Sequence, residues 1–220
     1  MIKLPKFKNK KLFEQAFTHR SYLNEAREKL KSNERLEFLG DSIISFVVSE
    51  CLFAQYPDFD EGTLTNLRSM LVNTKTLAVV AKELEFGNLL KLSKGEEETK
   101  GRENISLLAD CFEAFIGALF LDQGIKETEN FIHQVLLPKT KFFVEKKAFK
   151  DPKSLLQEMI QAKKQKSPAY IVVKEEGPPH KKIFTVSVNI GNVVLGKGKG
   201  KSKQEAEKNA AQEALESIKP

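Results

Sequence analysis

The sequence is poor in the residues that mark several large classes of protein. Cysteine occurs only twice, as Cys51 and Cys111, and histidine only three times. The two cysteines have no spacing typical of a zinc site and cannot build a disulfide framework, so we expect two buried thiols in a reducing compartment. The N-terminal segment MIKLPKFKNKK is basic and lacks the apolar run of a signal peptide. These features together favour the cytoplasm.

Long apolar runs are lacking as well. The longest apolar stretch, residues 115–121, is far shorter than the roughly 20 residues that a helix needs to cross a bilayer. Hydrophobic residues make up 40% and charged residues 30% of the chain. This balance is typical of a soluble globular protein and not of a disordered one. We therefore expect no membrane partner.

Positive charge is in excess, and it is unevenly distributed along the chain. Of the net charge of +6, residues 151–220 hold +5, from 13 Lys and 8 Asp plus Glu, whereas the first 150 residues hold +1. An ordinary solvated basic surface would explain this excess. A module that binds a polyanion and is joined to a nearly neutral body would explain it too.

The apolar pattern of residues 1–146 predicts an all-α domain. Apolar residues recur at helical spacing in five segments, at roughly 12–17, 36–53, 63–84, 105–122 and 126–143. The polar segment 93–104 contains two glycines and should form an exposed loop. Residues 147–151 are charged and precede Pro152, a residue that suits the first turn of a helix, so we interpret them as a linker.

Residues 152–220 follow a different pattern, which predicts a small α+β domain of order α-β-β-β-α. A helix at about 152–165 is followed by three short β-branched runs, at 170–173, 183–188 and 193–195. The pair Gly191-Asn192 is typical of a tight hairpin turn. A final helix at 202–218 would place Ala206, Ala210, Ala214 and Ile218 on one face. Residues 196–203, GKGKGKSK, form the one low-complexity patch.

Acidic residues gather on two of the predicted helices. On the first, Glu34, Glu37 and Asp41 fall within about 60° of one another, because a helix turns about 100° per residue. On the second, Asp110 and Glu113 stand three residues apart among apolar neighbours. Carboxylates in such surroundings repel one another and lose hydration, so a cation should offset the cost. Glycine at position 40 would let a neighbouring backbone approach closely.

Two such helices packed face to face would create a site made only of oxygen ligands. Oxygen ligands suit Mg²⁺ or Mn²⁺. Pairs of these ions catalyse phosphodiester hydrolysis by activating water and stabilising the leaving oxygen. Acidic residues on amphipathic helices are more often merely solvated, and the residues by themselves leave both interpretations open.

The segment NERLEFLGDS, residues 33–42, resembles the signature of the ribonuclease III family. Further marks of the family are THRS at 18–21, Asp60-Glu61-Gly62, and LADCFEAFIGALFLD at 108–122, so the resemblance covers essentially the whole chain. It implies an endonuclease that hydrolyses double-stranded RNA by two-metal-ion catalysis. The products would carry 5′-phosphate and 3′-hydroxyl ends with a short 3′ overhang. Ribosomal precursors, messenger RNA and other structured RNAs would be the substrates.

The resemblance also implies roles for individual acidic residues. The catalytic metal ligands would be Glu37, Asp41, Asp110 and Glu113, with Mg²⁺ as the ion, Mn²⁺ as a possible substitute and no organic cofactor. Glu34 and Glu61 match further acidic positions around the cleavage site. Two other interpretations stay open, because Glu61 could be an ordinary loop carboxylate and Glu34 could pair with a basic neighbour.

A homodimer is a further implication of the resemblance, with one site contributed by each subunit. Phe38 occupies the position at which family members insert an aromatic ring into the partner subunit. The predicted helix over 34–50 is apolar almost all round, which indicates burial on several sides. The core of an ordinary monomer would explain that pattern equally well.

The C-terminal unit resembles a double-stranded RNA-binding domain, a module that contacts the shape, phosphates and 2′-hydroxyls of about 16 base pairs. The match lies in three regions. They are Gln157 and Glu158 on the first helix; the loop Gly177, Pro178, Pro179 and His180; and the start of the last helix, Lys201, Ser202, Lys203 and Gln204. The unit departs from the usual pattern at Gln204 and Glu207, where many such domains have lysine.

The start of the last helix has a feature of its own. Ser202 and Glu205 form the S-x-x-E pattern of a capping box. Lys199, Lys201 and Lys203 crowd the same end, although the helix dipole disfavours cations there. Backbone N–H groups, the dipole and lysines in one place would make a phosphate site. A flexible basic tail is the alternative.

Two other functions fit parts of the sequence. A double-stranded RNA-binding protein that keeps the fold without cleaving would have lost a carboxylate, whereas all four candidate ligands are present here. A metal-dependent phosphohydrolase acting on nucleotides would need only the helical domain, and the C-terminal module argues against it. His19 and His133 are expected to pack or to face solvent.

Overall fold

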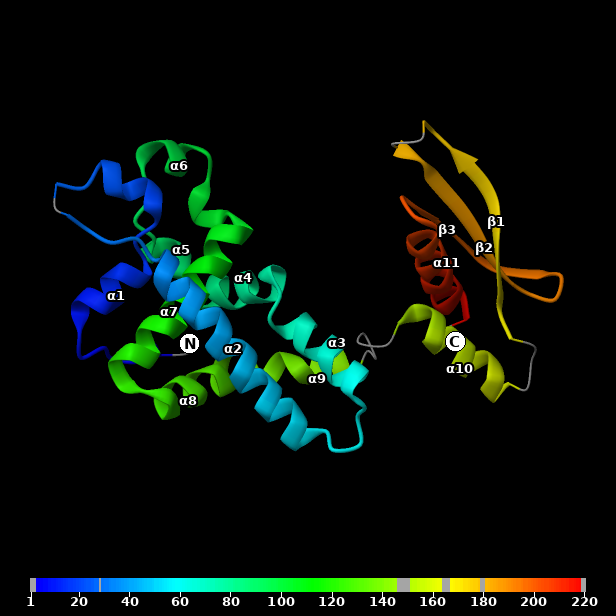
Figure 1. Ribbon diagram of the computed structural model, residues 1–220, viewed down its shortest axis with the longest axis horizontal. Helices are drawn as coiled ribbons and strands as arrows, with labels where there is room; N and C mark the ends of the chain where they lie inside the picture. Colours follow the sequence, from blue (N-terminus) through cyan, green and yellow to red (C-terminus); the bar gives the residue numbers. More distant parts are fainter. Residues whose placement is uncertain (1–2, 28, 146–150, 164–166, 179–180, 219–220) are drawn as a thin grey trace. The chain divides into compact units, whose positions relative to one another are not determined.

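The chain divides into two compact units, residues 1–149 and 150–220, in a computed structural model that describes residues 3–27, 29–145, 151–163, 167–178 and 181–218 (Figure 1). Of the linker predicted at 147–151, only Asp151 is described, directly before the first helix of the second unit. In the described residues, no helix is both long enough and apolar enough to span a membrane. Cys51 and Cys111 are buried and unpaired with each other, as the sequence predicts.

The first unit is all-helical in its described part, as predicted. Its elements are α1 (Lys10–Ala16), the 3-10 turn η1 (Arg20–Asn24), α2 (Glu34–Gln55), α3 (Glu61–Leu71), α4 (Thr74–Glu83), α5 (Phe86–Leu89), α6 (Lys94–Glu98), the 3-10 turn η2 (Gly101–Glu103), α7 (Ile105–Gln123), α8 (Ile125–Val135) and α9 (Pro138–Glu145). Helix α7 is central, because it packs against α1, α2, α4 and α8.

Helix α7 is held in a fixed rotation by a cluster of aromatic rings. The ring of Phe115 lies with its centroid 5.0–6.3 Å from those of Phe7, Phe13, Phe17, Phe86 and Phe131. Such pairs contribute about 0.5–1.5 kcal/mol each beyond the burial of their area. Glu113 lies about 200° around the helix from Phe115. Packing of Phe115 into the cluster therefore directs Glu113 to the opposite side of α7.

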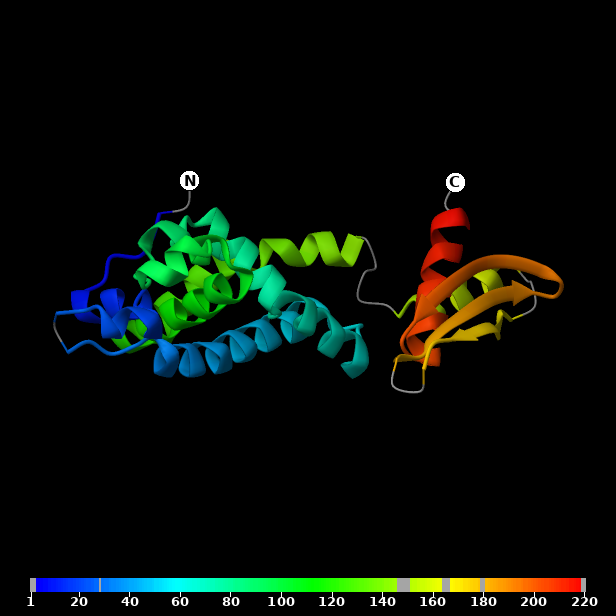
Figure 2. The same ribbon diagram turned by 90° about the horizontal axis from the view of Figure 1, so that it is seen from above.

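Helix α2 is buried along one side only, so the prediction that it is buried on several sides is wrong for a single subunit. One stripe, which includes Leu36, Ile44 and Val48, is buried against the core. Phe38, Phe46 and Phe53 form a second stripe and are 78%, 61% and 75% exposed. In Figure 2, α2 runs along the edge of the N-terminal unit. An exposed stripe of aromatic side chains is typical of an interaction surface.

Helix boundaries differ from the predicted ones where a polar cap or a proline interrupts the apolar pattern. The segment 63–84 is broken at Asn73, whose side chain accepts a hydrogen bond from the Thr76 N–H at 3.0 Å and so starts α4. The segment 126–143 is broken before Pro138, which starts α9 because proline fits the first turn of a helix and not its interior. The predicted loop 93–104 contains α6 and η2; Ser93 caps α6 through the Glu96 N–H.

The second unit has the predicted order α-β-β-β-α. It consists of α10 (Pro152–Ala162), β1 (Ala169–Glu176), β2 (Ile183–Ile190), β3 (Val193–Gly200) and α11 (Lys203–Ile218). The strands form one antiparallel sheet in the order β1-β2-β3. Helix α11 packs against β2, β3 and α10, as Figures 1 and 2 show. Gly191, with a φ of 56°, forms the predicted turn between β2 and β3.

Strand β3 is longer than predicted, because the apparent low-complexity segment belongs to the sheet. Gly196, Gly198 and Gly200 face α11; a Cβ atom at Gly198 would lie 2.1 Å from the Ala210 backbone nitrogen. Ala206, Ala210 and Ala214 form the facing side of α11 and are fully buried. The alternating glycines and the alanine face are therefore two halves of one close contact, and Lys197 and Lys199 between the glycines are exposed.

Candidate functional site

Helices α2 and α7 come into backbone contact at two glycines. A Cβ atom at Gly40 would lie 1.8 Å from the Glu113 carbonyl oxygen, and one at Gly117 would lie 2.2 Å from the Leu36 carbonyl oxygen. The expectation that Gly40 permits a close approach is thus confirmed. Glu37 lies one turn before Gly40, and Glu113 lies one turn before Gly117. The contact therefore brings these two carboxylates close together.

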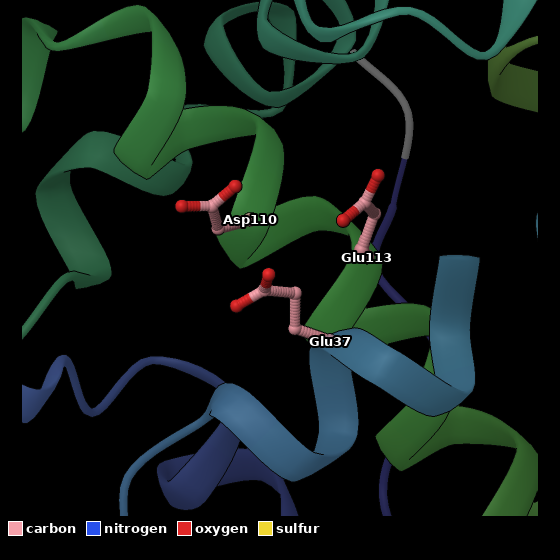
Figure 3. Close-up of side chains that lie close together, drawn as sticks. All are labelled: Glu37, Asp110 and Glu113. Carbon is pink, nitrogen blue, oxygen red and sulfur yellow. The ribbon is translucent and has the colours of Figure 1, made fainter.

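Three of the four predicted ligands surround a common space. One carboxylate oxygen from each of Glu37, Asp110 and Glu113 lies within 4.8 Å of the other two, and Figure 3 shows the three side chains around the gap between α2 and α7. Asp41 is exposed and is not a member of this group of three. Its charge nevertheless acts on the group, since it raises the pKa of both Glu37 and Glu113.

Burial and mutual repulsion weaken the acidity of these carboxyl groups. Loss of hydration is the main reason that the pKa of Glu113 rises to about 8, and the charges of Asp41, Asp110 and Glu37 add to it. Burial likewise raises the pKa of Glu37, with contributions from Asp110, Glu34 and Asp41. The pKa of Asp110 is raised by burial and partly lowered again by His19. Without a cation, the cluster holds a proton at neutral pH.

A cavity of about 400 Å³ opens beside these carboxylates. It is lined by His19, Arg20, Asn33, Glu34, Glu37, Leu90, Leu107 and Asp110. Glu34 has the basic neighbour that the sequence allowed for, because its carboxylate lies 3.6 Å from the Arg20 guanidinium, and it also accepts a hydrogen bond from the Ser32 hydroxyl at 2.7 Å. Glu34 therefore lines the cavity with Arg20 as its partner and lies outside the group of three carboxylates.

Two residues of the cavity wall are not anticipated by the sequence. His19 was expected only to pack or to face solvent, whereas it lines the cavity together with Asp110. Asn33 is buried and ties the start of α2 to the segment before His19, because its backbone N–H donates to the Thr18 carbonyl at 2.9 Å and its side chain to the Ala16 carbonyl at 3.4 Å. His19 lies in the motif THRS and Asn33 in the motif NERLEFLGDS, so these two motifs could have identified both residues from the sequence.

The remaining predicted residues of the helical unit lie elsewhere. Glu61 is the first residue of α3 and accepts a hydrogen bond from the Thr65 hydroxyl at 3.2 Å. It lines a different, largely apolar cavity of about 550 Å³, together with Phe46, Leu52, Phe53 and other residues of α2 and α3. Phe38 stands in the exposed aromatic stripe of α2. The structure of one subunit does not bring Glu61 into the carboxylate cavity.

The predicted RNA-binding residues of the second unit are exposed where they are described. Gln157 and Glu158 lie on α10, Gly177 and Pro178 follow β1, and Lys201, Ser202, Lys203 and Gln204 lie at the start of α11. Gly177 has a φ of 92°, a left-handed conformation that suits glycine at this turn. Pro179 and His180 fall outside the described residues.

The start of α11 is capped as its sequence predicts. The Ser202 hydroxyl accepts a hydrogen bond from the Glu205 N–H at 3.1 Å. The Glu205 carboxylate accepts one from the Lys201 N–H at 2.6 Å, one residue earlier than in the standard capping box. The lysine side chains remain on the surface beside this helix end, where they offer positive charge next to the helix dipole.

Two ion pairs join the three predicted RNA-binding regions. The Lys203 ammonium group lies 3.7 Å from Glu175, which stands two residues before Gly177. The Lys153 ammonium group on α10 lies 2.6 Å from Glu207 on α11. Glu207 stands where many such domains have lysine, and in this protein it connects α10 to α11. The two ion pairs thus connect the end of β1 and the first turn of α10 to the start of α11.

The chemistry of the donor set in the helical unit fits a divalent metal ion. All donors are carboxylate oxygens, which Mg²⁺ and Mn²⁺ prefer over softer ligands. Two ligands of one Mg²⁺ ion, each about 2.1 Å from it, lie at most about 4.2 Å apart, close to the 4.8 Å within which these oxygens lie. A cation would also offset the charge repulsion that adds to the raised pKa values of Glu37 and Glu113.

Comparisons with known proteins point to one family. A family model described as Ribonuclease-III-like matches residues 9–140, and one described as a double-stranded RNA binding motif matches residues 152–218. The chain is 49% identical over 217 residues to Ribonuclease 3 of Bacillus cereus (strain G9842), an alignment that covers 97% of this chain and 87% of that protein. Ribonuclease 3 of Bacillus anthracis (strain CDC 684 / NRRL 3495) gives the same figures.

Solved structures agree with this assignment. The chain is 39% identical to the nuclease domain of ribonuclease III from Campylobacter jejuni, with a TM-score of 0.55; the match covers 59% of this chain and 87% of that one. That domain is described as flexible in a region involved in dimer formation. Dicer from Pichia stipitis is 33% identical, with a TM-score of 0.50, and the match covers 97% of this chain and 96% of that one.

Proposed function

The chain belongs to the ribonuclease III family and is an endoribonuclease with a double-stranded RNA-binding domain, and we propose that Glu37, Asp41, Asp110 and Glu113 hold its catalytic metal ions. The observation that carries the proposal is the group of three carboxylate oxygens within 4.8 Å of one another. Asp41 is included because it lies on the same face of α2 as Glu37 and already acts on the group through its charge.

Mg²⁺ is the ion that we propose, with Mn²⁺ as a functional substitute. Bound there, such ions would supply an activated water molecule and neutralise charge on the phosphate and the leaving oxygen. The protein's own residues set the conditions for binding. Glu113 carries a proton at neutral pH in the metal-free protein, because its pKa is about 8, so that metal binding releases this proton. The backbone contact at Gly40 and Gly117 keeps the ligands of α2 and α7 in register.

The second unit would hold the duplex while the first unit cuts it. Gln157, Glu158 and the loop at 177–180 would contact 2′-hydroxyls in the minor groove. Lys201, Ser202, Lys203 and Gln204 would contact phosphates, and the exposed N-terminal end of α11 supports this role. The distribution of charge supports these separate roles, since residues 151–220 hold +5 of the net +6.

We propose that the functional unit is a homodimer formed through α2. The exposed stripe of Phe38, Phe46 and Phe53 supports this, as does the apolar cavity beside it, which Glu61 also lines. In a symmetric dimer the same stripe is used by both subunits. Phe38 would enter the partner subunit, and two sites would cut opposite strands, leaving a short 3′ overhang with 5′-phosphate and 3′-hydroxyl ends. Precursors of ribosomal RNA and structured messenger RNA in the cytoplasm are the proposed substrates.

One experiment tests the metal dependence and the products. The protein is incubated with a perfect RNA duplex in the presence of Mg²⁺, and in a parallel reaction with EDTA; both are analysed on a denaturing gel. We expect cleavage only with Mg²⁺ and ends that a ligase joins without prior phosphorylation. Binding without cleavage in both reactions would instead indicate a non-cleaving RNA-binding protein.

The role of the carboxylates is tested by Glu113→Gln. This change keeps the size of the side chain but removes an anionic ligand, so the cleavage rate should fall by at least about a hundredfold. Duplex affinity in EDTA should stay within about twofold of that of the unchanged protein, because the RNA-binding surface lies in the other unit. Glu127→Gln, on the exposed first turn of α8, is the matched control and should cleave normally. Loss of duplex binding in Glu113→Gln would contradict the assignment.

A further inference from the structure

His19 is held in one orientation by hydrogen bonds to a single edge of its ring. Its Nδ1 atom accepts a hydrogen bond from the Ser21 N–H at 3.3 Å and lies 2.8 Å from the Ser21 hydroxyl oxygen. That hydroxyl oxygen accepts a hydrogen bond from the Ser93 N–H at 3.0 Å. The imidazole is therefore fixed between the turn η1 and the start of α6, two segments far apart in the sequence.

These contacts determine which nitrogen of the neutral ring carries the proton. A nitrogen that accepts from a backbone N–H cannot itself be protonated, so Nδ1 is the acceptor. The Ser21 hydroxyl can donate its own hydrogen to Nδ1, because its oxygen already accepts from Ser93. We assign the proton to Nε2 on this basis. Within the described part of the chain, Nε2 has no hydrogen-bond partner.

His19 lies in the wall of the cavity beside the carboxylate group. This cavity of about 400 Å³ is lined by Asp110 as well. We propose that the Nε2–H group of His19 binds a non-bridging phosphate oxygen of the RNA strand that enters this cavity. The inference rests on the proposed function, since it takes the adjoining carboxylates to be the cleavage site.

A neutral donor is well suited to this wall of the cavity. The RNA phosphate is anionic, and the cavity is lined by the carboxylates of Glu34, Glu37 and Asp110, so an approaching phosphate needs a hydrogen-bond donor. Arg20, the cation of this wall, is paired with Glu34. A further lysine or arginine would pair with the metal ligands and compete with the metal ion. An imidazole N–H donates a hydrogen bond without adding a full charge.

His19 also has a structural role, which the test must separate from binding of phosphate. The residue caps η1, because its side chain accepts from the Ser21 N–H. His19→Asn keeps an acceptor at this position, since the Asn side-chain oxygen is a good cap, but it removes the distant N–H group. His19→Gln places an N–H group farther along the side chain and weakens the cap. His19→Asn therefore tests the loss of the N–H donor, and His19→Gln tests the loss of the cap.

The experiment compares both variants with the unchanged protein in single-turnover cleavage of a perfect RNA duplex at saturating Mg²⁺. Melting temperature and duplex affinity are measured in EDTA. For His19→Asn we expect a cleavage rate lower by about tenfold or more, the effect of about 1.4 kcal/mol, with unchanged melting temperature and unchanged duplex affinity. His19→Gln should cleave faster than His19→Asn although it melts at a lower temperature.

Three results would overturn the inference. The first is normal cleavage by His19→Asn. The second is cleavage by His19→Gln that is no faster than cleavage by His19→Asn. The third is a decrease in cleavage rate that parallels the decrease in melting temperature across the variants. Ser21→Ala is a second test, because it removes one anchor of the ring and leaves Nε2–H in place. Its rate should fall by less than that of His19→Asn, and an equal fall would also count against the inference. Failure of the unchanged protein to cleave, or normal cleavage by Glu113→Gln, would refute the proposed function instead.

Discussion

At the scale of single residues, the carboxyl group of Glu113 would link the stability of the protein to the proposed metal ion. The folded structure buries this group beside three other carboxyl groups, which raises its pKa from an ordinary 4.5 to about 8. The cost of ionising Glu113 falls on the folded state alone, because the unfolded chain hydrates and separates the same groups. A bound cation removes that cost, so metal, pH and folding are coupled at this position.

The pH dependence of the metal-free protein follows from the sign of this shift. Below about pH 4.5 Glu113 is protonated in both states, so its contribution to stability is fully present and does not change with pH. Between about pH 4.5 and 8 the folded state holds a proton that the unfolded chain has released, so the contribution of Glu113 to stability falls as the pH rises and is lost above about pH 8. We expect the melting temperature in EDTA to decrease over this range relative to that of Glu113→Gln. Thermal denaturation of both proteins between pH 5 and 9 measures the difference.

Mg²⁺ provides the control for this pH experiment. Because the ion displaces the proton, the rise in melting temperature that Mg²⁺ produces should be larger at pH 8 than at pH 6 in the unchanged protein. In Glu113→Gln the rise should be small at both values. If the melting temperatures of the two proteins in EDTA change with pH in the same way from pH 5 to 9, the pKa of Glu113 is not raised by its surroundings.

At the scale of elements, close backbone contacts position both the carboxylate group of the helical unit and the helix α11 of the RNA-binding domain. Gly40 and Gly117 allow α2 and α7 to touch, and the glycines of β3 allow α11 to lie against the sheet. In each case a methyl group would collide with backbone atoms of the facing helix, which cannot move aside as a flexible side chain could. The proposed metal ligands and the predicted RNA-binding residues lie directly beside these contacts.

Gly117→Ala tests the contact between α2 and α7. The added Cβ atom would lie 2.2 Å from the Leu36 carbonyl oxygen, so the helices must separate. We expect a loss of stability of about 1–3 kcal/mol, the usual cost of overpacking, and at least about tenfold weaker binding of Mn²⁺. Chemical denaturation and metal titration measure the two effects.

Gly95→Ala is the matched control for this change. A Cβ atom at Gly95 meets nothing within 4 Å, and the residue lies in the short helix α6. The substitution should leave stability unchanged or raise it by up to about 1 kcal/mol, because alanine favours the helix more than glycine does. Equal stability of the two variants would argue against a tight contact at Gly117.

The start of α11 is tested by the double substitution Lys201→Ala and Lys203→Ala. Removal of two cations from a phosphate-binding helix end should weaken duplex binding and reduce the dependence of log affinity on log salt concentration by about 1 for each phosphate that is no longer neutralised. Lys203 is partly engaged by Glu175, so Lys201 should account for more of the effect. Binding in EDTA at several salt concentrations measures the slope.

A control with the same change of charge is available in the same domain. Lys174 and Lys197 are exposed, and Lys197 lies on β3 between the glycines that face α11, so its side chain points to the opposite face of the sheet. Replacing both by alanine should leave the salt slope nearly unchanged. A similar loss of slope in the two double variants would mean that net charge, and not the helix end, governs binding.

At the scale of the whole molecule, the exposed aromatic stripe of α2 is the strongest support for the proposed dimer. Phe38, Phe46 and Phe53 are each more than half exposed, although aromatic side chains of this size usually gain about 1.5–3 kcal/mol when they are buried. Their alignment on one face of the helix suits a symmetric interface, in which each subunit covers the stripe of the other.

Phe38→Glu tests the dimer. A charged side chain at the most exposed aromatic position should prevent two stripes from packing together, because its burial without a partner is costly. We expect the unchanged protein to sediment as a dimer and Phe38→Glu as a folded monomer with greatly reduced cleavage. Val79→Glu introduces the same charge at an exposed apolar residue of α4 and should remain dimeric. A monomeric unchanged protein would refute the proposal.

The sequence by itself determined the features that depend on near neighbours in the chain. Apolar periodicity defined the long helices and the order α-β-β-β-α, and helical spacing put Glu37 with Asp41 and Asp110 with Glu113. Local hydrogen bonding also accounts for the cap at Ser202 and the turn at Gly191, since both need only a few consecutive residues. The motif NERLEFLGDS identified the family from ten consecutive residues.

Only the tertiary structure decided which of these residues meet. It joined Glu37 to Asp110 and Glu113, left Asp41 at the edge and Glu61 in another cavity, and brought His19 to the cavity wall. It also turned an apparent low-complexity segment into a strand, because glycines at alternate positions fit against the alanines of α11. Such contacts depend on the packing of segments distant in the chain, and periodicity within one segment carries no information about its neighbour in space.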